Sequence, residues 1–473
     1  MTLPNDIATP TSAGRYDATD SKGRRKAPAD RLFSEDTHLA SRDRRKLIGG
    51  TRDLARNYTA AAWAIRKHLD YTATFQFQAR TGDDRLNQAI EAYLENWALA
   101  DNCDVARRHP LSRLIRLLEA RRTVDGDVFM LLLSDGKLQP IEAERIATPP
   151  PTISPPSSLA ISPYTHGVRT DEAGAAIGFA LCNRTGDGRT VIFEREIPAA
   201  ACVHHGHFDR FDQVRGISPL ASAYNTLRDT YEAFDYALAK LKVAQLFGLV
   251  FYRDGIDSVG AITEVADTEE TGTRYDVDFG RGPVKLELEP GDKAEFLESK
   301  TPGSEFQSYT TQQIALALKA LDIPYSFFDE SFTNYSGARQ ALLMYEQSAA
   351  SKRRELAAVL DRITTWRLAL AVIDGELTLP AGVTVADLDW EWIPTGLPWI
   401  DPLKEITADV AAINAGLDST PSAAKRSGGD AYELARQEAA YRNYRRQLGL
   451  PVDLPAAITA NQLATAPEPP ANE

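Results

Sequence analysis

The first candidates for chemistry in this sequence are three histidines in the segment HHGH, at His204, His205 and His207. His-x-x-His spacing, on a strand that runs into a turn, would bring two imidazoles together, as metal ligation requires. No cysteine or carboxylate stands at a spacing that would complete such a site. The pattern therefore favours hydrogen bonding at an interface between subunits, and we expect no metal and no cofactor.

Motifs of catalysis are absent from the sequence. It contains no GxxxxGK[ST], no HExxH, no CxxC pair and no GxSxG. Phosphate cradling, zinc-dependent hydrolysis and nucleophilic serine chemistry therefore lose their usual signatures. We predict no catalytic residues, although clustered carboxylates that hold a metal have no fixed motif and stay open as an alternative.

A second group of candidates is an aromatic segment between two predicted helices. Aromatic side chains most often pack in a core. A cluster of aromatic residues beside Gly337 is also compatible with a mobile loop that contacts duplex DNA without sequence specificity. The candidates are Tyr325, Phe327, Phe328, Phe332, Asn334 and Tyr335.

Charge gives two further groups. The net charge is −13, whereas a nucleic-acid binder neutralises phosphates with a basic face, so tight DNA binding is not expected. Between Asp254 and Glu298 there are 13 Asp or Glu against 4 Lys or Arg. The acidic candidates for docking a partner are Asp267, Glu269, Glu270, Asp276 and Asp278. The cations on predicted helices, which more often pair with acids across a subunit interface, are Lys240, Lys242, Lys319, Lys352, Arg353 and Arg354.

The elements that position these residues begin with helices. Apolar periodicity predicts helices from Ser41, over Arg85–Leu99 and over Pro110–Arg122. The segment DGDVFMLLLSDGKLQPI then predicts a strand, an Asp-Gly turn and a second strand. Short strands follow at Ile177–Cys182 and Thr190–Phe193. Residues 36–216 are therefore expected to form an α+β domain, after a disordered tail at 1–35.

Two long helices follow. One is predicted over 219–246, where Leu220, Tyr224, Leu227, Tyr231, Phe234, Leu238 and Leu241 form an apolar seam. The other is predicted from Ser336 to Ile373, with the same logic at Leu342, Ala349, Leu356, Leu360, Ile363 and Leu370. Helices this long exceed what an ordinary globular domain needs, so we expect a bundle or an oligomer. The fold class is therefore α+β, mainly α.

Composition bounds the remaining possibilities. A chain of 473 residues is expected to form two or more domains. No run of about 18 apolar residues is present, so no membrane contact is expected. The three separated cysteines, Cys103, Cys182 and Cys202, favour a reduced compartment over a disulfide scaffold.

Five segments in a fixed order carry a resemblance to a known family. They are RDLARNY (Arg52–Tyr58), VDGDVF (Val124–Phe129), HHGHFDRFDQVRGISPLASA (His204–Ala223), LEPGDKAEF (Leu288–Phe296) and LDIPYSFFDESFTNYSGAR (Leu321–Arg339). The ordered set resembles the lambda-type tailed-phage portal proteins, and the resemblance covers roughly Arg42 to Leu448. Gly337 departs from the family, which usually has a second Ser there.

The resemblance implies a portal fold, with a wing, two stem helices, a clip, a tunnel loop, a tunnel helix and a crown. The expected parts are the wing at 36–216, the stem at 217–247, the acidic β-rich clip at 248–303, the second stem helix at 304–323, the tunnel loop at 324–336, the tunnel helix and wing return at 337–400, the crown helices at 401–450 and a disordered tail at 451–473. On this basis the aromatic segment would face DNA, the six cations would face the lumen, and the acidic residues would dock partners.

The resemblance also implies a non-enzymatic function. Twelve subunits would form a ring, the head–tail connector, at one capsid vertex of the virion, through which duplex DNA is packaged and ejected. The partners would be the terminase large subunit, the major capsid and scaffold proteins, head-completion or adaptor proteins, and double-stranded DNA that passes non-specifically. The protein would be located in the host cytoplasm during assembly.

Two alternatives from other classes stay open. One is a DNA-processing, metal-dependent enzyme with an acidic site, which magnesium-dependent cleavage of plasmid DNA would favour. The other is a structural capsid or tail-adaptor ring without a DNA path. An open central hole in negative-stain images would favour the portal over both.

Overall fold

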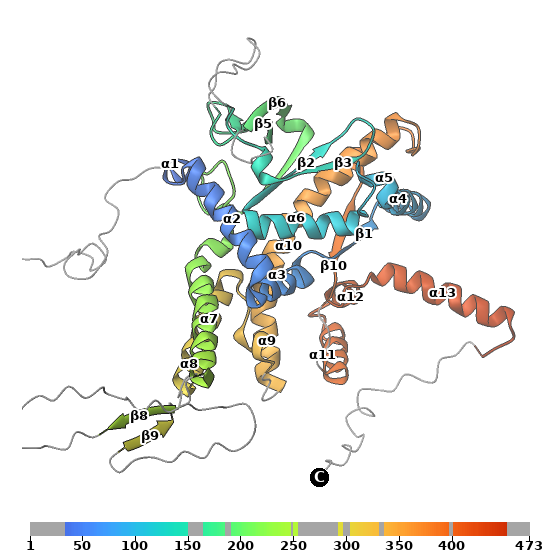
Figure 1. Ribbon diagram of the computed structural model, residues 1–473. Helices are drawn as coiled ribbons and strands as arrows, with labels where there is room; N and C mark the ends of the chain where they lie inside the picture. The colour runs from blue at the N-terminus through green and yellow to red at the C-terminus, as the bar shows by residue number, and fades with distance from the viewer. Residues whose placement is uncertain are drawn as a thin grey trace, which may run out of the picture. The chain divides into compact units, whose positions relative to one another are not determined.

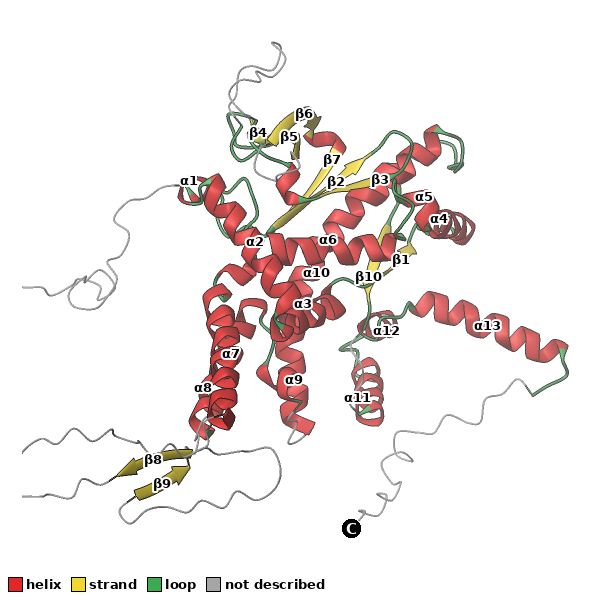
Figure 2. Ribbon diagram, in the orientation of Figure 1, coloured by secondary structure: helices red, strands yellow, loops and turns green. Residues whose placement is uncertain are grey.

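The computed structural model describes residues 34–149, 164–184, 191–246, 249–253, 292–296, 303–330, 335–396 and 401–451 (Figure 1). The chain divides into two compact units. The first holds Met1–Ser222 together with Lys319–Glu473, and the second holds Ala223–Leu318. Helices make up most of the described regular structure, and strands form four small sheets (Figure 2). The prediction of an α+β, mainly α fold is confirmed. No described helix is long and apolar enough to cross a membrane.

The first unit opens with helices that pack on one another. They are α1 (Glu35–His38), α2 (Ser41–Asn57), α3 (Thr59–Thr72), α4 (Asp84–Trp97), α5 (Ala100–Cys103) and α6 (Leu111–Asp125). Asp83 caps α4, because its carboxylate accepts from the backbone N–H groups of Arg85 and Leu86. Helices α2, α3 and α6 contact one another in the structure. The predicted helices are confirmed to within a few residues at each end.

Three sheets belong to this unit. In the first, β2 (Asp127–Leu132) pairs with β3 (Leu138–Ile141) and β7 (Cys202–Gly206). In the second, β5 (Ala176–Arg184) lies between β4 (Val168–Thr170) and β6 (Val191–Pro198). In the third, β1 (Phe75–Ala79) pairs with β10 (Trp390–Pro394), from opposite ends of the sequence. The predicted hairpin and strands are present, and the β1–β10 pair is an addition that no local pattern indicated.

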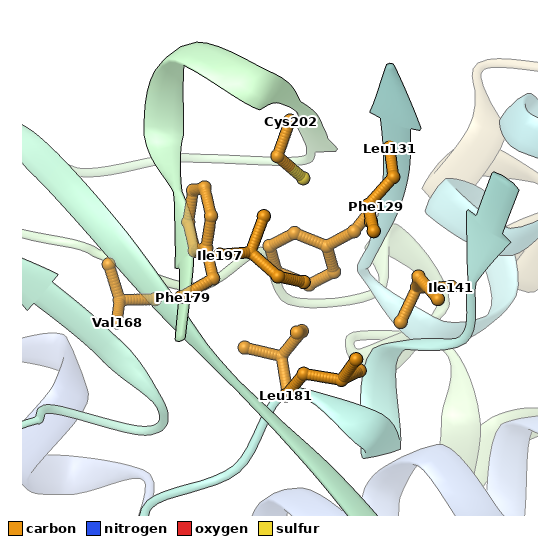
Figure 3. Close-up of a cluster of buried hydrophobic side chains, with 9 residues drawn as sticks. Phe129, Leu131, Ile141, Val168, Phe179, Leu181, Ile197 and Cys202 are labelled. Atoms are coloured by element: carbon orange, nitrogen blue, oxygen red, sulfur yellow. The ribbon is translucent and has the colours of Figure 1, made fainter. Parts of the chain in front are cut away.

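A buried apolar cluster joins the first two sheets. Phe129 of β2 and Phe179 of β5 meet edge to face, with ring centroids 5.1 Å apart (Figure 3). Alternation along each strand points every second side chain into this cluster. Its other members are Leu131, Ile141, Ile146, Val168, Leu181, Ile197 and Cys202. The cluster fixes β2, and therefore the polar residues at its start.

The longest element is α10 (Tyr335–Ile373), with 39 residues. It is about 58 Å long at the usual rise per residue. Its predicted seam lies inside the same chain, because Ala349, Leu356, Leu360 and Ile363 are all buried there. The sequence predicted a bundle or an oligomer for this helix, and at these four positions the seam is covered within a single chain.

A short helix stands where the sequence predicted a loop. Helix α9 (Tyr325–Asp329) begins after Pro324 and ends at Glu330, which has a left-handed backbone with φ of 54°. Proline is favoured next to a helix start because its φ is already fixed near the helical value. Five residues are too few for an apolar period, so the aromatic composition alone guided the prediction of a loop.

The second unit contains α7 (Tyr224–Leu246), α8 (Ser304–Leu318) and the pair β8 (Leu249–Arg253) and β9 (Asp292–Phe296). Helices α7 and α8 contact each other, with Phe234 and Phe306 edge to face at 5.7 Å. The predicted helix over 219–246 is divided, because Pro219–Ala221 forms a 3-10 turn before α7. Ser218 caps this turn, since its hydroxyl accepts from Leu220 N–H.

The C-terminal helices return to the first unit. They are α11 (Pro402–Asn414), α12 (Thr420–Arg426) and α13 (Ala431–Gln447). Asp430 caps α13 and also pairs with Arg80 at 2.8 Å, which ties the start of this helix to the segment that follows β1. Helices were expected over 401–450, and α11, α12 and α13 lie within that range.

Candidate functional site

The most densely bonded polar group in the described chain surrounds Asp127, the first residue of β2. We call Arg44, Asp127, His204 and Arg215 the Asp127 cluster. Arg44 Nη2 lies 2.7 Å from the Asp127 carboxylate, and Arg215 donates to it from Nε at 2.6 Å and from Nη2 at 3.0 Å. Gly216 N–H and His204 Nε2 complete the shell at 3.0 and 3.2 Å. Asp127 is fully buried, so these partners replace water.

Two glycines allow this arrangement. Helix α6 ends at Gly126, whose φ of 97° is unfavourable for other residues. The backbone there meets Gly216 so closely that a Cβ on Gly216 would lie 2.1 Å from the carbonyl oxygen of Gly126. The segments VDGDVF and QVRG therefore meet at their glycines, and Asp127 and Arg215 pair beside that contact.

Electrostatics keep the Asp127 cluster ionised at its centre. Burial alone would raise the pKa of Asp127, but Arg215 and Arg44 hold that pKa well below its usual value. Burial lowers the pKa of Arg44 to about 10. Burial also lowers the pKa of His204, against the opposing effect of Asp127, so His204 is neutral at pH 7.

A second buried group, the Glu119 cluster, contains His68, Glu119, Arg122 and His205. His68 and His205 each place Nε2 at 2.9 Å from one oxygen of Glu119, and Arg122 donates to it at 3.1 Å. Arg122 also bonds Glu355 of α10. The cluster joins α3, α6, β7 and α10. Its His68 keeps Nδ1 buried without a partner among the described residues.

The only group of described carboxylates spaced for a metal is Asp125, Glu142 and Glu144. Arg52 occupies this group, because its guanidinium bonds Asp125 at two atoms, each at 2.7 Å, and also reaches Glu142 and Glu144. A cation is therefore already supplied by the protein, in the fork geometry that suits carboxylates. We call these four residues the Arg52 cluster, and its geometry favours an ion-pair role over metal ligation.

The structure corrects the interpretation of the histidine motif. His204 and His205 lie on β7 and bond carboxylates of their own chain, so they do not serve an interface between subunits. His207 lies 3.5 Å from Asp209 and is partly exposed. The partners of His204 and His205 are Asp127 and Glu119, which stand too far away in sequence for a spacing rule to find.

The described aromatic candidates pack within the first unit. Phe327 lies 6.0 Å from Tyr71 and 5.7 Å from Tyr345, measured between ring centroids. Phe328 meets Trp63 edge to face at 5.2 Å, and Tyr325 lies 5.9 Å from Phe328. All three are half-buried. Tyr335 is the first residue of α10, while Phe332 and Asn334 lie outside the described residues.

The six cation candidates have different surroundings. Lys352 bonds Asp322 and the Leu321 carbonyl at 3.0 Å each, and buried Arg353 bonds Glu346 and the Tyr71 carbonyl. Arg354 is exposed on α10, Lys319 is exposed before α9, and Lys240 and Lys242 are exposed on α7. Lys352 and Arg353 thus pair inside one subunit, where the sequence favoured pairing across an interface.

The acidic candidates Asp267, Glu269, Glu270, Asp276 and Asp278 lie outside the described residues. The strand that closes the acidic segment, β9, is described and pairs antiparallel with β8. The LEPGDKAEF segment therefore ends in a strand.

The clusters around Asp127, Glu119 and Arg52 join elements of the first unit that stand far apart in the sequence. Three of the segments that carry the resemblance meet at the Asp127 and Arg52 clusters, namely RDLARNY, VDGDVF and the segment that contains QVRG. Residues 22–353 match the model of the family described as phage portal protein, lambda family. The chain belongs to this family.

Two phage portal proteins agree with this assignment, and a chain of a solved structure is similar as well. Portal protein B of Escherichia phage lambda is 23% identical over 447 residues, which cover 84% of this chain and 83% of that protein. The portal protein of Escherichia phage N15 is 21% identical over 445 residues, with 84% of each chain covered. A chain in the neck of an empty GTA particle has a TM-score of 0.47 and 16% identity, and covers 85% of this chain and 94% of its own.

Sequence reasoning missed the clusters around Asp127, Glu119 and Arg52. Asp127 and Arg52 stand in two of the quoted portal-family segments, but the segments alone did not show which residues they would pair with. The available signal was an Asp on each side of Gly126, directly before a run of apolar residues. A charged residue that begins a fully buried strand needs a partner, and Arg215 is the arginine of the QVRG segment.

Proposed function

We propose that copies of this chain form a ring of twelve at one capsid vertex, and that duplex DNA enters and leaves the capsid through the opening of the ring. Membership of the portal family supports the class of function. The structural observation that carries ring assembly is the apolar surface of the α7–α8 pair. Its large exposed side chains are Tyr231, Phe234, Tyr236, Leu238, Tyr309 and Leu316.

This surface suits a contact between copies. Tyr236 is 73% exposed and Leu316 is 59% exposed, although both belong to helices of a well-formed pair. Several large apolar side chains exposed on one pair of helices favour an interaction site there. In a closed ring each subunit presents the same two surfaces to its two neighbours. The exposed side chains of α7 and α8 in every subunit would then be covered by the adjacent subunits.

The test of assembly is light scattering and negative-stain microscopy of the purified full chain. We expect closed rings with an open centre. A stable monomer of 52.0 kDa at micromolar concentration would contradict the proposal. Rings that are closed at the centre would favour the adaptor alternative.

The proposed passage of DNA is consistent with charge. A net charge of −13 gives few phosphate contacts, so binding of free duplex should be weak and show little dependence on salt. Filter binding across salt concentrations measures this. A submicromolar, sequence-specific complex at physiological salt would overturn the idea of a passive conduit, and magnesium-dependent cleavage would favour the enzyme alternative.

We further propose that the aromatic segment and the exposed cations Lys240, Lys242, Lys319 and Arg354 face the DNA path. Phe327 and Phe332 form a matched test. Because Phe327 packs on Tyr71 and Tyr345, Phe327→Ala should destabilise the subunit by about 3 kcal/mol. Phe332→Ala should leave rings intact and shorten the packaged genome if the loop engages DNA. Full-length, stably held genomes in the Phe332 variant would refute that role.

The acidic residues Asp267, Glu269, Glu270, Asp276 and Asp278 are proposed to dock the terminase large subunit and the head-completion proteins. Other partners would be the capsid and scaffold proteins, and the location would be the virion. Reversing the charge of Glu269 and Glu270 should weaken terminase binding in a pull-down and leave ring formation unchanged. Equal terminase binding by the charge-reversed variant and the unaltered chain would contradict this docking site.

A further inference from the structure

A cavity of about 450 Å³ lies beside the first half of α13. Its walls come from β1, α4, α6, α10, β10 and α13. Three glutamates line it, Glu91, Glu95 and Glu433, and no lysine or arginine does. Four aromatic side chains also line it, Phe75, Phe77, Trp97 and Trp392. Carboxylates beside aromatic faces are the surroundings that a guanidinium prefers.

The three glutamates differ in the hydrogen bonds and ion pairs that they make. Glu91 accepts from Gln78 Nε2 at 2.6 Å and from Ala79 N–H at 3.1 Å. Glu433 pairs with Arg436 on its own helix at 3.0 Å. Glu95 is exposed and makes no hydrogen bond or ion pair with any described residue. The cavity therefore holds more negative charge than its described surroundings neutralise.

The other end of the same helix has the opposite character. The sequence YRNYRR (Tyr441–Arg446) places three arginines, Arg442, Arg445 and Arg446, in the last two turns of α13. Tyr441 and Tyr444 are 52% and 57% exposed. The side chains here bond only within the helix or to the Pro451 carbonyl, as Arg445 does at 2.8 Å. This basic end has no acidic partner on another element of the described chain.

One chain cannot bring these two ends together. Glu433 and Arg445 are separated by twelve residues of continuous helix, which is about 18 Å. A straight helix does not fold back on itself, so the basic end can enter such a cavity only in a different molecule. Contacts of this head-to-tail kind repeat from copy to copy, and they form a ring when the rotation between neighbouring copies closes.

We propose that the basic end of α13 in one copy inserts into the cavity lined by Glu95, Glu433 and Trp392 in the next copy. The inference rests on the proposed ring and names one of its contacts. A second copy of this chain is favoured over DNA as the occupant, because the complementary cavity belongs to the same chain and the net charge of −13 opposes the approach of a duplex.

A cysteine pair tests the contact directly. In the full chain, Glu95→Cys combined with Arg445→Cys should give a ladder of covalent multimers on a non-reducing gel after mild oxidation. The native cysteines Cys103, Cys182 and Cys202 are all buried, so they should contribute no background. The two single-cysteine variants are the controls, and they should stay unlinked.

Charge exchange gives the second measurement. Arg445→Glu and Glu95→Lys should each raise the concentration needed for assembly by about tenfold, because like charges would then meet across the contact. The double variant Arg445→Glu with Glu95→Lys should recover most of the assembly.

Each remaining outcome overturns the inference. Rings in the microscope without a covalent ladder would leave the proposed function standing and remove this contact. Monomers in every variant, and in the unaltered chain, would remove both. Unchanged rings in a variant with Arg442, Arg445 and Arg446 all replaced by Glu, accompanied by loss of duplex retention, would assign the basic end to DNA.

Discussion

The start of β2 and the α7–α8 pair are opposites in how they use their surfaces. At β2, charged groups are buried and fully partnered within one chain, as with Asp127 and its bonds to Arg44, Arg215 and His204. On α7 and α8, large apolar groups remain exposed, as with Tyr236 at 73% and Leu316 at 59%. The first region is complete in a single subunit. The second has a surface that another chain would complete.

This difference indicates that the buried ion pairs at β2 stabilise the subunit, whereas the exposed side chains of α7 and α8 affect assembly. Breaking a buried ion pair leaves an uncompensated charge, which costs far more than an exposed contact is worth. Removing an exposed apolar group leaves the isolated subunit nearly unchanged. Mutations in the two regions should therefore separate folding from assembly.

The largest effect is expected at Asp127. Asp127→Asn removes the negative charge that Arg44 and Arg215 share, and leaves two buried guanidinium groups facing each other. The free energy of unfolding should fall by about 3–5 kcal/mol. Urea denaturation followed by circular dichroism measures the loss.

The matched control is Asp43→Asn on α2. Asp43 pairs with Lys46 at 3.6 Å, and both side chains are more than half exposed. This change should alter stability by less than about 1 kcal/mol. Equal losses in the two variants would mean that the Asp127 cluster is no more important than a surface pair.

The second effect compares two leucines on α7. Leu227 is 5% exposed, so Leu227→Ala should cost about 2–5 kcal/mol of stability. Leu238 is 50% exposed, so Leu238→Ala should cost less than about 0.5 kcal/mol in the dissociated subunit but weaken assembly. Thermal unfolding at low concentration and light scattering at high concentration give the two readouts. Assembly that is unaffected by the Leu238 change would remove that residue from the interface.

The two seams show how far the sequence could lead. Heptad spacing predicted both long helices, and α10 ends at Ile373 as expected. The same spacing could not tell that Leu356 and Leu360 are covered by their own chain while Leu238 is left exposed. Periodicity gives the face of a helix and says nothing about which molecule covers it.

The polar clusters lay further beyond sequence reasoning. Asp127 and Arg215 stand 88 residues apart, and His205 and Glu119 stand 86 apart. Such pairs form only after β7 has paired with β2 and α6 has packed beside them. The ordered family segments could be identified from their letters, whereas their meeting around Gly126 and Gly216 depends on a backbone approach that no single segment reveals.

The third prediction is a pH dependence confined to the first unit. Burial lowers the pKa values of His68 and His204, so both stay neutral in the folded chain while their unfolded counterparts gain protons below about pH 6.5. The unfolded state then binds more protons, and the free energy of unfolding falls as the pH falls. Glu119 and Asp127, whose pKa values are held well below the usual range, add a second loss as the pH falls through about 4.

The α7–α8 unit provides the contrast, because residues 223–318 contain no histidine. Hydrogen exchange at pH 7.5 and pH 5.5 should show faster exchange in β2, β7 and α6, with little change in α7 and α8. His68→Gln should reduce the dependence between these two pH values. Stability that rises on acidification would contradict the assignment of neutral, buried histidines.

The smallest effects are expected on α10, where both kinds of surface occur two residues apart. Lys352 bonds Asp322 and the Leu321 carbonyl, and its side chain is 19% exposed. Arg354 is exposed and donates only weakly, to the Ala350 carbonyl at 3.4 Å. Lys352→Met should therefore cost about 1 kcal/mol of stability, while Arg354→Met should stay within about 0.5 kcal/mol of the unaltered chain.

For DNA packaging, we expect the larger effect from the Arg354 substitution and the smaller effect from the Lys352 substitution. If exposed cations on α10 meet DNA as it passes, Arg354→Met should change the rate of packaging while its rings form normally. Lys352→Met should act only through its small loss of stability, because its ammonium group is already bound to its own chain. Measuring packaged DNA length against time for both variants, beside their unfolding curves, separates the two roles. An Arg354 variant that packages DNA at the normal rate would show that Arg354 does not contact the passing DNA. The part of α10 around this residue would then have a structural role only.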